Sequence, residues 1–399
     1  MTTRICITTL EFPPEVGGVG ESVHRIATML FNSGYEVHVA VFNSTQFKTA
    51  TETCRGGVRT QQQDGLYVHH ISAAVRGDVP VIYDYSSEVY FHLKQLHKTY
   101  KFDLFHAFFL NETGFLTTLL ARELDIPVIN SIRGSDLHKH IFNAKNHSQI
   151  VWTLDNSDWV TSVSRDLLHR AQVLIPSLKG RSNAFWNSIA PVDMSNLPIP
   201  DPMPTLRGPV IGSVGRFREK KGLEFLLDAC KELSAEMDFT LLLVGDFADR
   251  ERSYWLKEIE DCGLGDRVVV TGMKDRLEAM AHLPFMDVFA IPSLHDGCPN
   301  AMLEAMLAGN AIVGSSADAI GEILDHGSTG WVVTPGSSVE LTAAIRTLLS
   351  SPELRLRFGQ AARHKALTQL APAVEQQNWN AAYAQVLGTV APVPYVHVA

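Results

Sequence analysis

The sequence VFAIPSLHDGCPNAMLEAMLAG, residues 288–309, contains the pattern that decides the fold class. Its first five residues, 288–292, are typical of a buried strand, and residues 300–308 have the composition of a helix. A loop with Asp296 and Gly297 lies between them. Because similar strand–loop–helix units recur along the chain, the sequence predicts an α/β protein with parallel sheets and crossover helices.

The same alternation extends from this stretch toward both ends of the chain. The expected strands are residues 5–10, 36–42, 104–108, 127–131, 210–214, 240–244, 267–271 and 311–314. The expected helices are residues 20–32, 114–124, 222–230 and 374–387.

A proline-rich stretch divides the pattern into two halves. Pro198, Pro200, Pro202 and Pro204 fall within seven residues, which is typical of a linker. We therefore expect an N-terminal domain over residues 1–195, a C-terminal domain over 205–373, and a helix over 374–390 that packs back on the first domain. Two such α/β units leave a cleft lined by loops at the carboxyl ends of strands, where ligands usually bind.

Composition and charge exclude several classes of protein. The chain has 399 residues, of which 45% are apolar and 19% charged, enough to bury a core without disulfides or metals. Its net charge is −9, from 34 Lys and Arg against 43 Asp and Glu, which argues against nucleic-acid binding through a broad basic face. No apolar run approaches the ~18 residues of a membrane span, so only peripheral contact with a membrane stays open.

The cysteines and the N-terminus bear on location. The five cysteines show no CxxC spacing, and their odd number argues against a disulfide framework. No signal peptide fits before the strand-like run that begins at Ile5. The sequence therefore predicts a cytoplasmic protein without a zinc or redox motif.

A glycine-rich turn follows the first expected strand. At Gly17 and Gly18 the main-chain amides could approach a phosphate or a sugar closely. Gly18-x-Gly20 is followed by Val23 where a dinucleotide fingerprint needs a third Gly or Ala, so an oxidoreductase is disfavoured. The alternative is a helix-capping turn with Glu21 in its first turn.

A charged loop follows the expected strand at 210–214. In its sequence GRFREKKG, residues 215–222, Arg216 and Lys221 would stand at the carboxyl end of that strand. Guanidinium and ammonium groups there could hold an anionic leaving group. The alternative is a solvated turn.

Two carboxylates frame the next loop. Asp296 and Glu304 lie eight positions apart, and the helix that begins at Asn300 offers main-chain amides to an anion. Carboxylates accept hydrogen bonds from sugar hydroxyls. The alternative is a turn residue and a solvated helix residue, but the apolar neighbours of Glu304 make an unpartnered carboxylate there costly.

These motifs have the order and spacing of glycosyltransferase family 4, and the chain resembles its retaining enzymes over most of residues 4–335. Supporting segments are LLVGD at 242–246 and VTG at 270–272. The resemblance implies the GT-B fold: two Rossmann-like α/β domains facing across a cleft. The acceptor would bind to the N-terminal domain and the nucleotide-sugar donor to the C-terminal domain.

The resemblance also implies a role for each matching residue. Gly17 and Gly18 would face the donor diphosphate and the acceptor, and Arg216 and Lys221 would bind the diphosphate and stabilise its departure.

The second motif would hold the rest of the donor. Asp296 would contact the hydroxyls of the donor sugar, which makes it the third catalytic candidate beside Arg216 and Lys221, and Glu304 would hold the ribose. The other donor-binding candidates are Lys274, near the base, and the loop and helix start formed by Gly297, Cys298, Pro299, Asn300, Ala301 and Met302.

The chain departs from the family pattern at residues 318–322, which read DAIGE instead of GGIPE, and at two candidate site residues. Arg133 stands where many members have His, and because Arg is no base near neutral pH, it could meet an anionic acceptor or the donor phosphate instead. Asp296 replaces a Glu, which retracts the carboxylate by ~1.5 Å. The candidates for the acceptor side or reaction centre are thus His106, Arg133 and Asp136; for His106 a core position is the alternative.

The resemblance implies transfer with retention at the anomeric carbon, with a diphosphate oxygen assisting deprotonation of the acceptor. The chain has no Asp-x-Asp motif of the kind that holds a divalent ion, and Arg216 and Lys221 could supply the charge instead. We therefore expect no cofactor and no metal beyond the nucleotide-sugar substrate. The acceptor would be a small molecule, a lipid or a glycan.

Two other functions stay open. One is an epimerase-like enzyme of the same fold that acts on sugar nucleotides. The other is a non-catalytic protein that binds nucleotide sugars. The oligomeric state, the base and the sugar are open as well.

Overall fold

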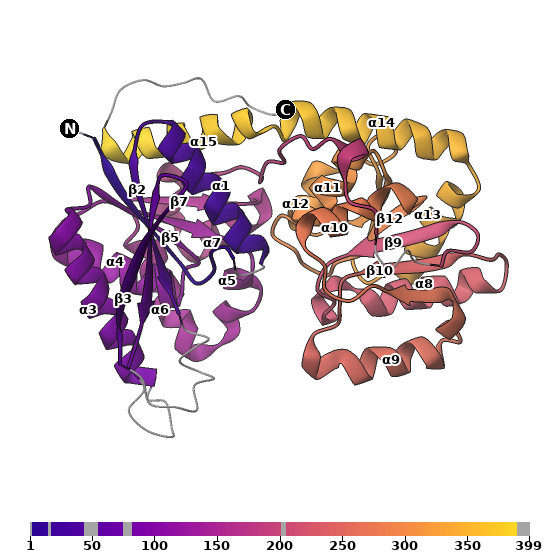
Figure 1. Cartoon of the computed structure of the whole chain (residues 1–399), viewed down its shortest axis with the longest axis horizontal. Helices are drawn as coiled ribbons and strands as arrows, with labels where there is room; N and C mark the ends of the chain where they lie inside the picture. Colours follow the sequence, from indigo (N-terminus) through magenta and orange to yellow (C-terminus); the bar gives the residue numbers. More distant parts are fainter. Residues whose placement is uncertain (1, 15–16, 44–54, 75–81, 201–204, 389–399) are drawn as a thin grey trace. The chain divides into compact units, whose positions relative to one another are not determined.

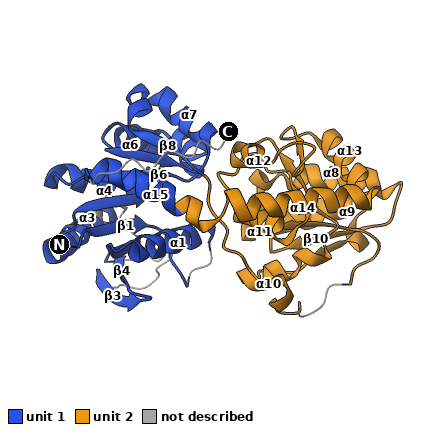
Figure 2. Ribbon diagram, turned by 90° about the horizontal axis from the view of Figure 1, so that it is seen from above, with its two compact units in different colours: residues 1–185, 376–399 blue, residues 186–375 orange. Residues whose placement is uncertain are grey.

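The computed structural model describes residues 2–14, 17–43, 55–74, 82–200 and 205–388. They form two compact units, Met1–Phe185 with Gln376–Ala399, and Trp186–Glu375 (Figure 2). Each unit is an α/β domain with its own sheet, as the alternation of elements predicts. Pro202, Pro204 and the tail after residue 388 lie outside the described residues.

Unit 1 is built on an eight-stranded sheet in the order β3-β4-β2-β1-β5-β6-β7-β8, in which only β3 and β4 pair antiparallel (Figure 1). The strands are β1 Arg4–Thr9, β2 Glu36–Phe42, β3 Gly57–Gln63, β4 Leu66–Ser72, β5 Leu104–Phe108, β6 Val128–Ile132, β7 Trp159–Ser162 and β8 Ser182–Ala184. The helices are α1 Gly18–Asn32, α3 Ile82–Tyr100, α4 Glu112–Leu124, α5 Ser135–His138, α6 Ala144–Asp155, α7 Arg165–Leu174 and, from Gln376 on, α15 Pro372–Leu387.

The central strands of unit 1 are buried on both faces. Every residue of β5 and β6 is buried, including the polar residues His106, Asn130 and Ser131, since helices cover both faces of a parallel sheet. On α1, Val23, Ile26 and Leu30 recur at helical spacing and join the same core. The carboxyl ends of β1, β5 and β6 therefore lie at one edge of a rigid sheet.

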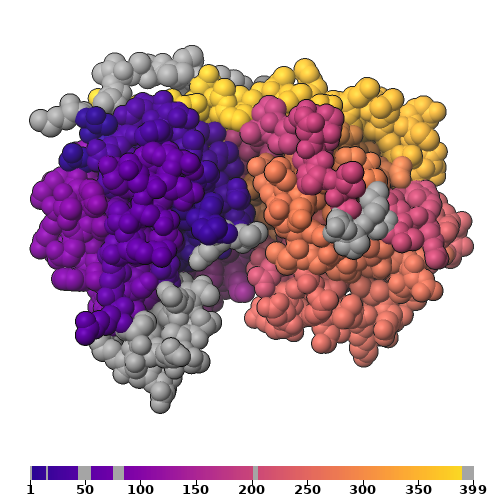
Figure 3. All heavy atoms as spheres, in the orientation of Figure 1, coloured from indigo at the N-terminus to yellow at the C-terminus, as the bar shows by residue number. Residues whose placement is uncertain are grey.

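The C-terminal helix completes unit 1. Trp379 and Tyr383, four residues apart on α15, lie in the core with less than 3% of their surface exposed. Gln376 donates to the main-chain oxygen of Met29 and to Ser33 Oγ at the end of α1. Figures 1 and 3 show α15 in yellow beside the indigo α1.

Unit 2 contains a six-stranded, fully parallel sheet in the order β11-β10-β9-β12-β13-β14. The strands are β9 Val210–Val214, β10 Thr240–Val244, β11 Val268–Val270, β12 Val288–Ile291, β13 Ala311–Ser315 and β14 Trp331–Val333. The helices are α8 Leu223–Ser234, α9 Arg252–Asp261, α10 Arg276–Ala281, α11 Asn300–Ala308, α12 Asp318–Ile323, α13 Ser338–Leu349 and α14 Pro352–Gln369.

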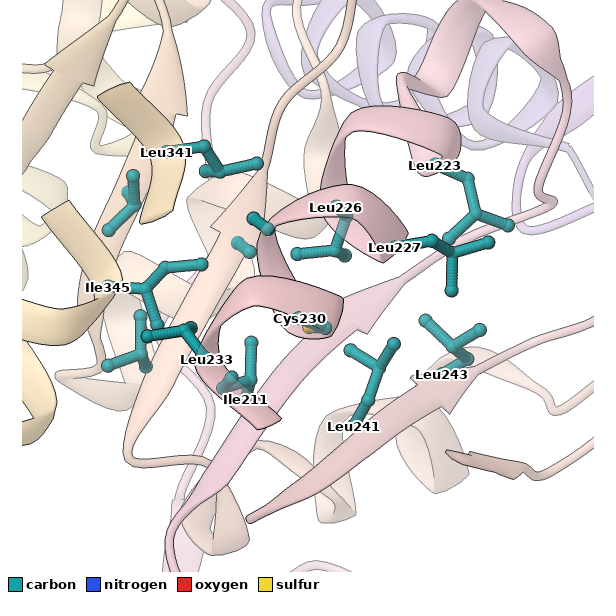
Figure 4. Close-up of a cluster of buried hydrophobic side chains, with 14 of the residues drawn as sticks. Ile211, Leu223, Leu226, Leu227, Cys230, Leu233, Leu241, Leu243, Leu341 and Ile345 are labelled. Carbon is teal, nitrogen blue, oxygen red and sulfur yellow. The ribbon is translucent and has the colours of Figure 1, made fainter. Parts of the chain in front are cut away.

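One face of the unit 2 sheet packs on α8 and α13. Figure 4 shows Leu226, Cys230 and Leu233 of α8 between Leu241 of β10 and Ile345 of α13. All five side chains are at most 1% exposed. Fully burying a leucine contributes about 1.5–3 kcal/mol, so this layer holds β9 and β10, and with them the loops at their carboxyl ends, in a fixed position.

The boundary between the units lies earlier than the sequence predicts. Residues 186–195 belong to unit 2, whereas the sequence predicts that they belong to the N-terminal domain. The reason is local contact: Trp186 Nε1 donates to Glu322 Oε2 at 2.9 Å, Ser188 N donates to Glu375 at 2.9 Å, and Ile189 is buried in the unit 2 core.

Candidate active site

The carboxyl ends of neighbouring strands in unit 2 carry loops that are bonded to one another. Gly245, after β10, forms a backbone bridge with Gly272, after β11. Leu294 N, after β12, donates to the main-chain oxygen of Lys220, after β9, at 2.9 Å. The charged loop at 215–222 is thus tied to the loop that leads into α11, at the edge where parallel sheets usually bind ligands.

A glycine makes this contact possible. Gly222 has φ +67°, and a Cβ there would come within 2.1 Å of the main-chain oxygen of Pro292. Both the left-handed backbone and the close approach require glycine. The loop at 215–222 can therefore lie directly on the end of β12 only because its last residue has no side chain.

Two lysines of this loop surround Asp296. Lys221 Nζ lies 2.5 Å from Asp296 Oδ2, and Lys220 Nζ lies 4.0 Å from Oδ1. Burial acts to raise the pKa of Asp296, but the two ammonium groups outweigh it and hold the pKa below its usual range. The structure therefore brings Lys221 and Asp296 into contact and adds Lys220, which is not among the residues that the sequence points to.

A second carboxylate shapes the same loop. Asp296 N donates to Asp318 Oδ2 at 2.8 Å, and Asp318 is 7% exposed. Its φ is +44°, a conformation that is unfavourable for a residue other than glycine and is kept only where the surroundings require it. Asp318 therefore acts as a positioning residue for the Asp296 loop.

Arg216 occupies the same loop but has a different partner. Its guanidinium lies 3.6 Å from Asp249 Oδ2, and 52% of its side chain is exposed. The pair is a weak surface ion pair, so the guanidinium can exchange Asp249 for an anionic ligand at little cost.

Glu304 is buried on α11, with 9% of its side chain exposed. Arg276 Nε, at the start of α10, donates to Glu304 Oε1 at 2.7 Å, which provides the partner that a carboxylate among apolar neighbours needs. Sequence reasoning missed Arg276, because it lies 28 positions earlier in the chain and no local pattern connects the two. Lys274 lies two residues before it, ahead of the capping box formed by Asp275 and Glu278.

Several polar groups at the start of α11 already have hydrogen-bond partners within the protein. Its N-cap residue, Pro299, makes no side-chain cap. Asn187 Nδ2 donates to Cys298 O at 3.3 Å and to Asn300 Oδ1 at 3.1 Å. The Met302 amide donates to Pro299 O at 3.1 Å, so its expected contact with the donor is replaced by a bond within the first turn. The remaining candidates are Gly297, in the preceding loop, and Ala301, in the helix.

In unit 1 the glycine turn lies after β1, at the start of α1. Gly17 is the N-cap residue, and no side chain caps the helix. A Cβ on Gly17 would come within 2.2 Å of Glu11 Oε2, so the turn packs against that carboxylate. The helix begins at Gly18, two residues before the start that the sequence predicts, and Glu11 is a neighbour that the sequence did not reveal.

Arg133 and Asp136 form a tight turn at the carboxyl end of β6. Asp136 accepts hydrogen bonds from Arg133 N at 2.8 Å and from Leu110 N at 2.7 Å and is fully buried. Burial raises the pKa of Asp136, and the two main-chain donors oppose the rise. Asp136 is therefore a positioning residue for the turn and has no exposed surface through which to contact an acceptor.

His106 is a core residue, so the expectation that it faces the reaction centre is corrected. It is fully buried, Nδ1 lies 2.7 Å from Tyr383 Oη, and Nε2 lies 2.7 Å from Ser131 Oγ. Burial, aided by the nearby charge of Arg133, lowers the pKa of His106 to about 3. Both ring nitrogens are thus used to join α15 to β6.

Two parallel-sheet α/β domains, with cationic loops and buried carboxylates at the strand ends, define the class: a GT-B glycosyltransferase. The family model described as "Glycosyltransferase Family 4" matches residues 16–175, and the model described as "Glycosyl transferases group 1" matches residues 208–351. The chain belongs to glycosyltransferase family 4.

Individual relatives agree with this assignment. The chain is 33% identical over 168 residues to the 2-deoxystreptamine glucosyltransferase of Streptomyces kanamyceticus, which covers 41% of this chain and 42% of that enzyme. It spans only 34–42% of the length of four such relatives. It is 22% identical to the N-acetyl-alpha-D-glucosaminyl L-malate synthase of Bacillus anthracis, over 89% of this chain and 91% of that protein.

Solved structures share the fold. The sucrose-phosphate synthase of Thermosynechococcus elongatus superposes with a TM-score of 0.81 at 18% identity, covering 97% of this chain and 100% of that one. The Anabaena protein HepE, solved with UDP-glucose, superposes with a TM-score of 0.71 at 18% identity and the same coverage of both chains.

In the part of the chain that the structure describes, no three His, Cys, Asp or Glu side chains gather as a metal site. Over the same residues, no helix is both long and apolar enough to cross a bilayer.

Proposed function

We propose that the chain is a retaining glycosyltransferase that moves a sugar from a nucleoside-diphosphate sugar to an acceptor hydroxyl without a metal. One observation carries the proposal: Lys220 and Lys221 converge on Asp296 beside the start of α11, in a loop that also presents Arg216. Cations fixed in a partly desolvated loop suit a leaving diphosphate. The structure of HepE with UDP-glucose supports a nucleotide sugar as the donor.

In the proposed reaction the donor sugar changes its bonding partner at the anomeric carbon. The bond between the sugar anomeric carbon and the diphosphate oxygen breaks, and a bond from that carbon to the acceptor oxygen forms. The acceptor proton passes to a diphosphate oxygen, so no protein nucleophile is needed. Lys221 and Arg216 stabilise the charge that develops on the diphosphate, Asp296 accepts hydrogen bonds from the sugar hydroxyls, and Glu304 accepts them from the ribose.

The first experiment separates binding from transfer. Thermal-shift titrations with UDP, ADP, GDP and dTDP identify the base, and the matching nucleotide sugars are then incubated with acceptors and EDTA. Lys221→Ala and Arg216→Ala should each lower kcat/KM for transfer by about 10²-fold or more with an unchanged far-UV spectrum. The matched control is Arg218→Ala, which removes an exposed cation from the same loop and should leave transfer within about twofold.

Each competing outcome has its own signature. Full activity in Lys221→Ala or Arg216→Ala overturns the diphosphate roles, and loss of activity in EDTA overturns metal independence. An isomerised nucleotide sugar without a glycosylated product favours an epimerase. Nucleotide binding without turnover in the presence of acceptors favours a non-catalytic binding protein.

A further inference from the structure

Arg133 lies at the edge of unit 1 where ligands of parallel sheets bind. It directly follows β6, which neighbours β5, and β5 neighbours β1, the strand that precedes Gly17. Its guanidinium lies over the Phe108 ring, 5.4 Å from the ring centre. Contact with an aromatic ring restrains a guanidinium. The position where family 4 commonly has a histidine thus carries a permanent, positioned cation.

The sequence segment that contains Arg133 is cationic in a chain whose net charge is −9. Between Asp125 and Asp155 the sequence contains Arg133, Lys139 and Lys145 but one acidic residue, Asp136. Lys139 and Lys145 are exposed. Asp136, by contrast, is fully buried and accepts two main-chain hydrogen bonds, so its charge is satisfied inside the turn. The exposed charge of this segment is therefore positive.

The histidines near this turn leave the net charge of the segment positive. His106, the buried neighbour of Arg133, has its pKa lowered to about 3 by burial and by the arginine, so it is neutral near pH 7. A histidine is either neutral or positively charged. The segment therefore gains no negative charge from its own histidines, which are His138, His140 and His147.

We propose that the acceptor carries an anionic group, a carboxylate or a phosphate, and that Arg133 binds it. The inference rests on the proposed function, because it assigns the acceptor of that reaction. The diphosphate of the donor already has Lys220, Lys221 and Arg216 in unit 2, so a further cation in unit 1 suits a second anion. Arg also presents a planar fork of N–H donors that matches carboxylate and phosphate oxygens.

The test measures anion binding while the donor site is filled. With the nucleotide that binds best at saturation, L-malate, glycerol 3-phosphate and neutral glycerol are titrated by calorimetry. The two anions should bind and glycerol should not. Arg133→Gln should weaken anion binding by about 10- to 100-fold, as for the loss of a charge-assisted contact, and leave nucleotide affinity within about twofold. Arg133→Lys, which keeps the charge and guards against misfolding of the first variant, should give an intermediate value.

A matched variant and vesicles complete the design. Lys98→Met removes an exposed cation from α3, close to the opposite edge of the sheet, and should leave anion affinity unchanged. Sedimentation with phosphatidylglycerol or phosphatidylcholine vesicles distinguishes the source of the anion. Arg133-dependent binding to the first lipid alone identifies a lipid headgroup, and its absence identifies a soluble acid or ester.

Three results would overturn the inference. The anions fail to bind in the presence of nucleotide, they bind Arg133→Gln as tightly as the unsubstituted chain, or the substitution weakens nucleotide binding and leaves anion binding unchanged. A different result would contradict the proposed function itself. In that case no nucleoside diphosphate would stabilise even the unsubstituted protein.

Discussion

Asp296 and Lys221 form an ion pair at the place where a negatively charged ligand is expected. Their 2.5 Å contact keeps the lysine in place, but the carboxylate also offsets part of the positive charge that a diphosphate needs. The pair therefore balances two demands: recognition of sugar hydroxyls by the carboxylate and attraction of phosphate by the lysines.

Asp296→Asn should separate these demands. The amide keeps the shape but removes the negative charge, so the affinity for nucleoside diphosphate should rise about 5-fold, as expected for a repulsion of about 1 kcal/mol. Transfer should fall by about 10-fold or more because the sugar loses a charged hydrogen-bond acceptor. Calorimetry with the nucleotide and an assay of product formation measure the two effects. Weaker nucleotide binding would contradict the expectation and show that Asp296 mainly positions the lysines.

At the scale of elements, glycines decide how the loops of unit 2 approach one another. Gly222 and Gly263 have nearly equal φ values, +67° and +69°, but only Gly222 approaches a neighbouring main chain. The two positions therefore distinguish the cost of a left-handed backbone from the cost of a clash.

Gly222→Ala should destabilise the protein more than Gly263→Ala. The control replaces a glycine with open space around it and should cost about 1 kcal/mol, since a non-glycine residue is disfavoured in this conformation. Gly222→Ala adds a clash with Pro292 O and should cost about 2–4 kcal/mol and weaken nucleotide binding, because Lys220 and Lys221 directly precede it. Urea denaturation and nucleotide titration test this; equal stability of the two variants would argue against the close packing of the loop on β12.

The sequence predicts the buried elements better than the exposed ones. Four expected strands, β2, β5, β9 and β10, have the bounds found in the structure, because parallel strands covered on both faces are short apolar runs. The hairpin of β3 and β4 is not among the elements that the sequence predicts. β3 is a polar edge strand, GVRTQQQ, and the signal of the hairpin was its turn, Asp64–Gly65, where both residues have positive φ.

At the scale of the whole molecule, buried histidines connect stability to pH. His38 Nδ1 lies 2.9 Å from His69 Nε2, His38 Nε2 lies 3.1 Å from Glu36, and His69 Nδ1 lies 2.8 Å from Thr60. Burial lowers the pKa of His38, and it lowers that of His69 to about 4. Burial also lowers the pKa of His97, and His106 has a pKa of about 3, so four histidines among the described residues of unit 1 resist protonation in the folded protein.

The free energy of unfolding should therefore fall as the pH drops from about 6.5 toward 4. In that interval the unfolded chain binds protons that the folded chain excludes. His69 and His106 therefore each contribute a slope of up to about 1.4 kcal/mol per pH unit, and the lowered pKa values of His38 and His97 act in the same direction. Asp136, with its raised pKa, opposes the loss, whereas Asp296, with its lowered pKa, adds to it below about pH 4.

Urea denaturation at a series of pH values measures this slope. His106→Asn should reduce it by about the share of one histidine, whereas His169→Gln on the exposed side of α7 should not change it. An unchanged slope in His106→Asn would contradict the neutral, buried state of His106.

The sequence alone determined the fold class, the family and the motif residues, because each depends on local order: apolar runs, glycine turns, and charges at fixed spacing after a strand. Lys221, Asp296 and Glu304 were predicted on that basis. Only the tertiary structure revealed the hydrogen-bond partners that come from distant segments. Arg276 bonds to Glu304, Asp318 accepts from the main-chain amide of Asp296, and Tyr383 bonds to His106. A hydrogen bond or ion pair between residues far apart in the chain depends on how strands are ordered in the sheet, and no local pattern of residues encodes that order.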